Sequence, residues 1–189
     1  MTKAMPRAFA ASGLGLLAIV LLAGPLSAQS EFRGRMFVVG GPNRPAAVNV
    51  KVVLDATTTV EEVARFQTLL NAGDIEGFYA SWRQTKKGSL QFTGGLGLKV
   101  DFYAAGEEKT EKGTKLLLAG ESRNLETGVG KRAHGSFLFL VVELNIGPDG
   151  SGSGRLYEDA RIAFTADGRL ALDSYLTTPK EIVNLKKTK

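Results

Sequence analysis

The chain contains no cysteine, one histidine and one tryptophan in its 189 residues. Without cysteine it has no disulfide framework, no thiolate nucleophile and no thiolate metal ligand, so its stability must come from packing. The single histidine and the absence of a Gly-x-Ser-x-Gly sequence leave no pattern for a serine-type catalytic triad. No Asp-x-Asp-x-Asp-Gly calcium loop is present either. We therefore expect no catalytic residue, no metal and no cofactor.

The chain carries only a small excess of positive charge. The chain has 24 basic and 19 acidic residues, and without Lys3 and Arg7 the remainder keeps 22 basic residues against 19, a net charge of +3. Such a weak excess argues against a nucleic-acid partner. Part of it lies near the C-terminus, where we expect a solvated tail rather than a docking patch for anionic lipid or polymer. That cluster consists of Lys180, Lys186, Lys187 and Lys189.

Residues 1–28 have the pattern of a secretory signal peptide. Lys3 and Arg7 precede an almost wholly apolar stretch over 8–23, and Gly24-Pro25-Leu26-Ser27-Ala28 supplies a breaker and small residues for cleavage. Cleavage is expected after Ala28 or after Ser30, and an uncleaved anchor is the alternative. Because no Arg-Arg pair precedes the apolar stretch, we expect the general secretory route, a periplasmic or extracellular location, and no membrane span after cleavage.

The longest apolar run after residue 28 covers 137–146, Phe-Leu-Phe-Leu-Val-Val-Glu-Leu-Asn-Ile. It is rich in aromatic and β-branched residues, turn-forming residues lie on both sides, and it is too short to span a membrane. Leu138, Leu140, Val142, Leu144 and Ile146 would share one face of a strand, while the other face becomes polar at its end. The run therefore predicts a central strand of an antiparallel sheet, buried on both faces over most of its length.

The rest of the chain predicts short strands and one helix. Thr58 or Thr59 can cap a helix with Glu61 or Glu62 as the capping-box partner, an apolar stripe follows, and Gly73 can end it. We expect that amphipathic helix at about 60–72. Segments in which apolar and polar residues alternate, together with short apolar runs, predict about ten strands. These lie at 31–39, 48–54, 76–83, 89–93, 98–104, 116–119, 137–146, 156–164, 170–176 and 182–185, with a charged connector at 106–113.

These elements indicate a mainly β (α+β) fold. Asp149-Gly150 and Asp167-Gly168 each stand between apolar alternations and predict hairpin turns. We therefore expect the last four strands to form a meander. The predicted architecture is a single domain over 29–189, an antiparallel β-sandwich or open barrel with the helix covering it.

Three stretches resemble exported bacterial proteins that are themselves uncharacterised. They are Phe66-Gln67-Thr68-Leu69-Leu70-Asn71-Ala72-Gly73-Asp74, Val141-Val142-Glu143-Leu144, and the closing segment from Gly154-Arg155-Leu156 through Ala160-Arg161-Ile162 to Asp173-Ser174-Tyr175. The resemblance is spread over 29–189 and includes no catalytic motif. It implies an exported β-rich domain and transfers no site residue.

The polar stretch 121–135 has no periodicity, and a loop of this length inside a compact domain is often functional. Its basic side chains and its histidine are candidate binding residues: Arg123, Lys131, Arg132 and His134. A hydrolase would need a carboxylate to orient His134, and Glu121 and Glu126 lie in the same stretch. An ordinary exposed histidine explains the pattern equally well.

A second candidate set lies on the strands before and after Asp149. If the hairpin turns there, Glu143 faces Tyr157, Arg155 is diagonal to Glu143, and Asn145 shares their face. Cross-strand ion pairing explains this set, and a binding or glycosidase-like site is the alternative. Alternation would point Glu158 inward, so we expect a β-bulge at Glu158-Asp159 rather than a buried charge.

We therefore expect a non-enzymatic, exported binding or structural protein of the bacterial cell envelope, with another envelope protein as its partner. The first alternative is a carrier of an apolar ligand in a barrel-like cavity, suggested by the many inward-facing apolar residues. The second is a hydrolase that uses a carboxylate near the His134 loop.

Overall fold

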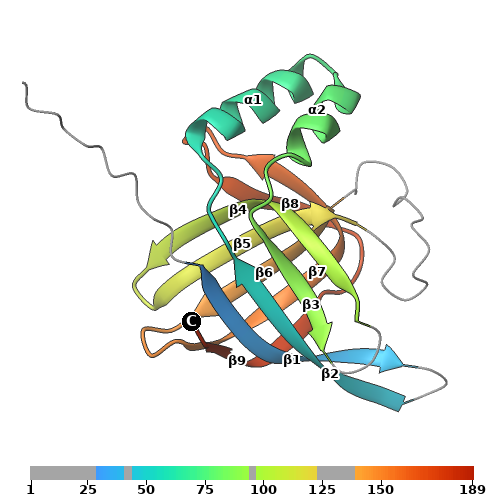
Figure 1. The fold of residues 1–189 in the computed structure, drawn as a ribbon, viewed down its shortest axis with the longest axis vertical. Helices are drawn as coiled ribbons and strands as arrows, with labels where there is room; N and C mark the ends of the chain where they lie inside the picture. The colour runs from blue at the N-terminus through green and yellow to red at the C-terminus, as the bar shows by residue number, and fades with distance from the viewer. Residues whose placement is uncertain (1–28, 41–43, 94–96, 123–138) are drawn as a thin grey trace, which may run out of the picture.

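The computed structural model describes residues 29–40, 44–93, 97–122 and 139–189 (Figure 1). The predicted signal peptide lies outside the described residues. Nine strands and two helices make up the described chain. The strands are β1 (Ser30–Gly40), β2 (Arg44–Leu54), β3 (Gly88–Thr93), β4 (Lys99–Thr110), β5 (Gly113–Glu121), β6 (Phe139–Ile146), β7 (Ser151–Phe164), β8 (Leu170–Tyr175) and β9 (Lys180–Lys187).

Eight of the strands form a closed antiparallel barrel. The pairing order is β6-β5-β4-β3-β2-β1-β9-β7, and β7 pairs with β6 to close the ring. The barrel confirms one of the two predicted architectures, except that it is closed rather than open. The sandwich is not observed. Each of the eight strands pairs with a neighbour on both sides, so the sheet has no gap at which it could separate into two layers.

Alternate residues of each barrel strand fill the interior with apolar side chains. The barrel core, as we call this cluster, consists of Phe32, Met36, Val50, Val52, Leu54, Leu90, Val100, Phe102, Ala105, Leu116, Leu118, Leu140, Val142, Leu144, Ile146, Leu156, Ile182 and Leu185. Leu118, Leu140, Leu144 and Leu156 are fully buried. A barrel of eight strands has an interior narrow enough for side chains such as these to fill.

Strand β6 is the long apolar run found in the sequence. Leu140, Val142, Leu144 and Ile146 point into the barrel core, while Phe139 and Val141 are buried on the outside. The strand lies between β5 and β7. The predicted central strand with two buried faces is therefore confirmed for the part of the run that the structure describes.

A second apolar cluster lies on the outside of the barrel, beneath the helices. It joins residues of β4, β5, β6 and β7 to both helices and to β8, and includes Phe66, Phe78, Trp82, Ala104, Leu117, Ala119, Phe139, Val141, Tyr157, Ala160 and Leu170. The Phe66 and Trp82 rings are 5.3 Å apart between centroids, and those of Trp82 and Phe139 are 5.4 Å apart. The helices therefore attach to the barrel through aromatic packing. Figure 1 shows both helices lying together at the top of the barrel.

Helix α1 (Val60–Asn71) begins and ends as its sequence predicts. Thr59 is the N-cap, and Thr59 and Glu62 form the reciprocal capping box. Gly73 has a φ of +71° just after the helix, a conformation that glycine adopts without strain.

Helix α2 (Ile75–Trp82) occupies a segment that the alternation predicts as a strand, so that prediction is wrong. Phe78 and Trp82 are four residues apart, a spacing that fits one face of a helix as well as one face of a strand. Both are buried against Phe66 of α1. The deciding local signal is Asp74, whose side chain accepts a hydrogen bond from the N–H of Gly77 as the N-cap.

The charged segment 106–110 belongs to β4 rather than to a connector. Its residues pair with Gly113 to Leu117 of β5 in a regular antiparallel ladder. The side chains of this segment are partly or fully exposed, so charge at these positions does not oppose strand formation.

The predicted four-stranded meander ends after β8. Strand β9 pairs with β1 and with the first half of β7, whereas β8 pairs with the second half of β7. The long strand β7 thus serves both the barrel and the β7–β8 hairpin outside it. The lysine-rich segment 180–187 is correspondingly a barrel strand, not the expected solvated tail.

Both predicted Asp-Gly turns are present and have the same geometry. Gly150 and Gly168 have φ values of +79° and +78°. In the second turn, the N–H of Gly168 donates to the carbonyl of Thr165 and the N–H of Thr165 donates to the carbonyl of Arg169. This is the three-residue hairpin in which a type I turn is followed by a glycine bulge.

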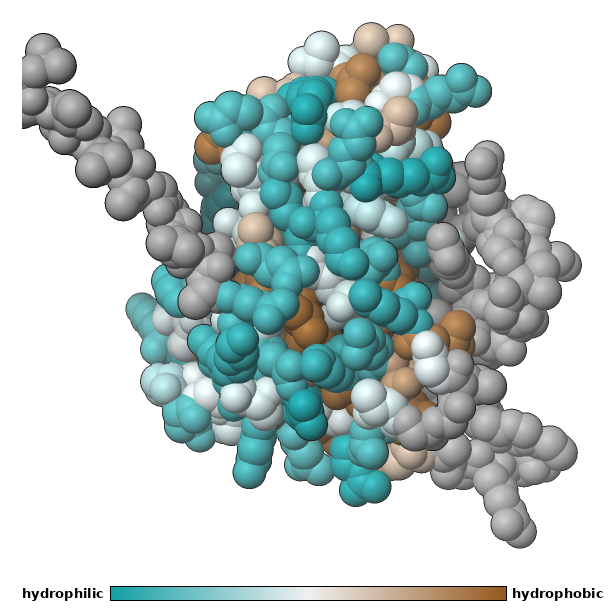
Figure 2. Space-filling view, in the orientation of Figure 1, coloured by the Kyte–Doolittle hydropathy of each residue, from teal (hydrophilic) through white to brown (hydrophobic). Residues whose placement is uncertain are grey.

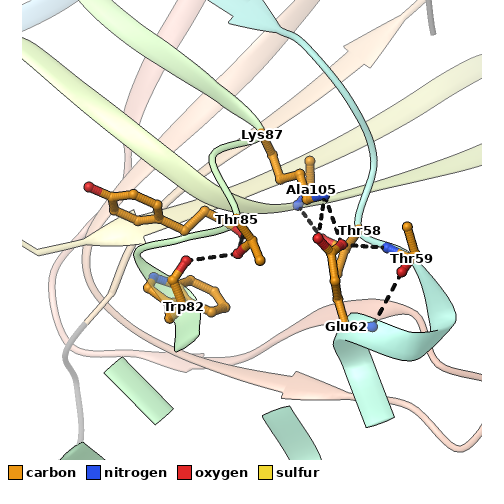
Figure 3. Close-up of polar contacts among 8 residues, drawn as sticks. Thr58, Thr59, Glu62, Trp82, Thr85, Lys87 and Ala105 are labelled. Carbon is orange, nitrogen blue, oxygen red and sulfur yellow. Dashed lines mark hydrogen bonds and ion pairs between the residues drawn. The ribbon is translucent and has the colours of Figure 1, made fainter. Parts of the chain in front are cut away.

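A polar network at the start of α1 ties the helix to the barrel (Figure 3). Lys87 is buried, and its Nζ lies 2.8 Å from Oε1 and 2.7 Å from Oε2 of Glu62. Thr58 exchanges two hydrogen bonds of 2.8 Å with Ala105 of β4, through its N–H and its hydroxyl. Because Glu62 also accepts the N–H of Thr59, one carboxylate serves the helix cap and the ion pair together.

Candidate functional site

A groove of about 410 Å³ runs between β8 and the outer face of the barrel. Strands β4, β5 and β6 form its floor, and β8 with the preceding turn forms its wall. Its lining residues are Gly106, Glu107, Glu108, Lys115, Leu117, Glu143, Thr165, Arg169, Leu170, Ala171 and Leu172. The groove brings Glu143, predicted from the sequence, beside residues that the sequence did not indicate.

Strand β8 pairs with β7 alone among the described strands, so its other edge is free. The hydrogen bond between Thr165 and Arg169 makes this facing pair a hydrogen-bonded one, and bonded and non-bonded pairs alternate along an antiparallel ladder. Leu170 and Leu172 therefore belong to pairs that are not hydrogen-bonded to β7. The N–H and C=O groups of Leu170 and Leu172 therefore point away from β7. Beyond Leu172, a bulge at Asp173 interrupts the regular pattern.

Gly106 allows the turn end of β8 to approach the barrel. A Cβ added at this glycine would lie 3.4 Å from Cβ of Leu170 and 3.7 Å from its carbonyl oxygen. The free edge at Leu170 thus faces the barrel wall closely, while both residues also line the groove. The backbone of Leu172, farther from this contact, is the part of the edge that a ligand in the groove can reach.

Ion pairs hold the charged side chains around the groove. Arg169 donates to Glu108 of β4 at 3.0 Å and to Asp167 in its own turn at 2.7 Å. The carboxylate of Asp167 raises the pKa of the Arg169 guanidinium, and that of Glu108 adds a smaller effect in the same direction. Lys115 lies 3.0 Å from the carboxylate of Glu143 across the floor. The groove therefore presents charges of both signs above an apolar floor at Leu117.

Two tyrosines and an arginine continue this surface past the groove. The rings of Tyr157 on β7 and Tyr175 on β8 are 4.9 Å apart between centroids, and half of Tyr175 is exposed. Burial raises the pKa of the Tyr157 hydroxyl most, and the negative charge of Glu143 raises it further. The positive charge of Arg155 lowers it. This carboxylate, guanidinium and phenol therefore influence one another electrostatically.

The predicted candidate residues divide into two groups. Arg123, Lys131, Arg132 and His134 lie outside the described residues, as does the loop that contains them. Glu143, Asn145, Arg155 and Tyr157 lie on the outer face of β6 and β7, as expected. Of these four, Glu143 lines the groove, whereas exposed Asn145 lines a separate hollow beside the β4–β5 turn.

The predicted register of this pair was wrong by two residues. Glu143 faces Arg155, and Tyr157 faces Val141. The expected bulge is confirmed, because Leu140 alone lies opposite the two residues Glu158 and Asp159. Glu158 pairs with Nζ of Lys180 at 2.7 Å, so its charge is compensated.

The described residues contain no group of three or more His, Cys, Asp or Glu side chains that could hold a metal ion. Neither of the two helices has the length and apolar character of a membrane span. The barrel core consists of buried apolar side chains, as ordinary core packing requires. The groove, in contrast, offers main-chain groups, an apolar floor and paired charges, which suit binding.

Comparisons of the chain with protein-family models, with curated proteins and with solved structures found no match.

Proposed function

We propose that this chain is a non-enzymatic binding protein of the cell envelope that holds an extended polypeptide segment in the groove beside β8. The single observation that carries the proposal is the free edge of β8 at Leu172, which borders a groove of about 410 Å³. An extended segment placed there can exchange main-chain hydrogen bonds with Leu172 as an added strand. Free edges of this kind are the usual place where a sheet accepts a foreign strand.

The groove favours a short segment with one apolar residue between polar ones. Leu117 offers an apolar floor, while the pair of Lys115 and Glu143 lies beside it. Alternate residues of an extended segment point to opposite sides, so an apolar side chain can face Leu117 and its neighbours can face solvent. Because the bulge at Asp173 disturbs the edge, the main-chain match extends over only a few residues.

The envelope part of the proposal depends on residues 1–28. Their charged start, apolar stretch and small residues before position 29 are the features that the general secretory route recognises. Intact mass spectrometry of protein expressed with this segment in a bacterium tests the point. A chain starting at Gln29 or Glu31 in the periplasmic fraction or medium is expected, and a full-length chain retained in the cytoplasm would contradict it.

Peptide binding is tested with a phage library of random ten-residue peptides selected on the immobilised protein. Enriched peptides are synthesised and titrated against the wild type, Leu172→Pro and Leu172→Val. Both variants shorten the side chain, but only proline removes the N–H on the free edge of β8. We expect roughly tenfold weaker binding for Leu172→Pro than for Leu172→Val, as for one lost hydrogen bond.

Circular dichroism and thermal unfolding establish that both variants fold before their affinities are compared. Peptides that bind L172P and L172V equally well would place the binding site elsewhere. Failure to enrich any peptide above a control surface would also refute the proposal. If L172P does not fold, Ala171→Arg, which fills the groove, replaces it, and undiminished binding then counts against the proposal.

A further inference from the structure

A band of basic side chains wraps the outside of the barrel on β4, β3, β2, β1 and β9. Strand registers place one residue of each strand in a continuous row across the five strands. Their inward neighbours Val100, Leu90, Val52 and Phe32 belong to the barrel core, so the row itself faces outward. The row consists of Lys99, Gln91, Lys51, Arg33 and Lys186.

The band is well exposed and weakly compensated. Arg35 lies two residues from Arg33 on the same face of β1, and Arg33, Arg35, Lys99 and Lys186 are exposed. Three carboxylates lie nearby: Glu31 pairs with Arg33 and Lys51, Asp101 lies 2.8 Å from Lys86 and 3.7 Å from Lys99, and Asp149 interacts with the charge of Lys186. With Lys86 included, six cations against three anions leave +3 on this surface, which equals the net charge of the whole of 29–189. Over β1, β2 and β3, Figure 2 shows many hydrophilic residues with smaller hydrophobic patches between them.

We propose that this cationic band, defined by Arg33, Arg35, Lys51, Lys99 and Lys186, binds a linear anionic polysaccharide. Adjacent strands are about 4.8 Å apart, so the band offers a positive charge at nearly every strand step. A polymer with a repeating carboxylate or sulfate can contact several of these cations at once. This surface is separate from the groove beside β8, so the two proposals stand or fall independently.

The curvature of the band favours a flexible polymer over a membrane. Five of the eight strands of a closed barrel cover about half its circumference, so Lys99 and Lys186 point in nearly opposite directions. A planar bilayer could touch only the middle of such a band, whereas a flexible chain can follow it.

The side chains around the cations favour a polysaccharide over a nucleic acid. Gln91 lies within the row, and Asn49 and Thr93 face each other in the adjacent row with Arg35 next to them. Amides and hydroxyls can donate to and accept from sugar hydroxyls. Single-stranded nucleic acids, in contrast, are bound by aromatic side chains on which bases stack. On the described part of this face, Phe37 is the large aromatic side chain that is exposed, and it lies outside both the row of Gln91 and the row of Asn49.

The test compares two triple variants that remove the same charge from the described chain. R33Q/R35Q/K186Q removes three cations of the band and keeps Lys51 to compensate Glu31. The control, K109Q/K112Q/R161Q, removes three cations located outside the band. Affinities for heparin and for polygalacturonate are measured at several salt concentrations by isothermal titration, with neutral dextran as the uncharged reference.

We expect the band variant to bind both anionic polysaccharides at least about tenfold more weakly than wild type, with a flatter salt dependence, because fewer counterions are exchanged. The control variant should lose less than about threefold by the same relation. Equal losses in the two variants would show a response to net charge alone and overturn the proposal. Stronger binding to anionic phospholipid vesicles or to single-stranded DNA, at equal charge concentration, would also overturn it.

Discussion

Glu143 and Arg155 face each other directly on β6 and β7, yet each interacts most closely with another residue. The Glu143 carboxylate lies 3.0 Å from Nζ of Lys115 on the neighbouring strand β5. The Arg155 guanidinium lies beside the hydroxyl of Tyr157, and this contact raises the pKa of Arg155. The facing pair therefore does not form an isolated ion pair but joins three strands of the outer surface into one electrostatic group.

The phenol of Tyr157 should report on both charges. Burial and the negative charge of Glu143 raise its pKa, whereas Arg155 lowers it. Glu143→Gln should therefore lower the Tyr157 pKa, and Arg155→Gln should raise it. NMR titration of the tyrosine ring carbons, assigned with Tyr157→Phe, measures both. Glu181→Gln, which changes a charge opposite Arg155 on β9, is the control. Shifts in the same direction for E143Q and R155Q would contradict this arrangement.

The ion pair between buried Lys87 and partly buried Glu62 should be sensitive to the loss of one partner. Glu62→Gln keeps an oxygen for the N–H of Thr59 but leaves a buried ammonium without its counter-charge. We expect a loss of about 3 kcal/mol in the free energy of unfolding, measured with urea. Adding Lys87→Met to E62Q should restore part of that loss. Glu61→Gln, in the same helical turn but exposed, is the control and should have a much smaller effect. If E62Q costs no more than E61Q, the ion pair does not stabilise the fold.

The hairpin turn before β8 should require a residue that tolerates a positive φ. Gly168 has a φ of +78°, and the nearest atom to an added Cβ, on Val63, is 4.0 Å away. Gly168→Ala should therefore cost about 1–2 kcal/mol through backbone strain alone. Gly168→Asn should cost less, because asparagine enters this conformation more readily. Chemical denaturation of the two variants measures the difference, and equal costs would indicate that the turn rearranges.

Acid stability should depend on Glu31. Lys51 and Arg33 lower its pKa from 4.5 to about 2 in the folded protein. Since the folded-state pKa is depressed, the stabilisation is present above pH 4.5 and is lost as the pH falls towards 2. Melting temperatures recorded between pH 5 and pH 2 should fall less steeply for Glu31→Gln than for the wild type. Parallel curves would show that Glu31 makes no such contribution.

Local patterns in the sequence predicted those parts of the fold that depend on neighbouring residues. The capping box of Thr59 and Glu62, the two Asp-Gly turns and the bulge at Glu158-Asp159 all follow from short-range rules. The prediction of a strand in segment 75–82 was wrong because the spacing of Phe78 and Trp82 fits both the helical and the strand period. The N-cap Asp74 favours the helix locally, and aromatic packing against Phe66 stabilises it, a contact about which sequence alternation carries no information.

The long-range pairings could not be predicted from local patterns. Nothing in segment 180–187 indicates that it pairs with β1, about 150 residues earlier, rather than with adjacent β8. The candidate groove shares this limit. Glu143 could be identified because it interrupts an apolar strand, but Arg169 and Leu172 belong to the groove only because β8 folds back over β4 and β5. A hairpin turn predicts that β8 follows β7, not where the pair will lie.

Closure of the barrel by β9 determines when the chain can finish folding. The strand must pair with both β1 and β7, and the ends of the described chain also meet, since the N–H of Thr188 donates to the carbonyl of Glu31 at 2.7 Å. Contacts between such distant residues form slowly. A ribosome synthesises β9 after the other strands of the barrel, so the growing chain remains an open sheet until β9 has emerged. If residues 1–28 engage the secretory route early, the chain is available for threading while the strand that would lock it is still missing.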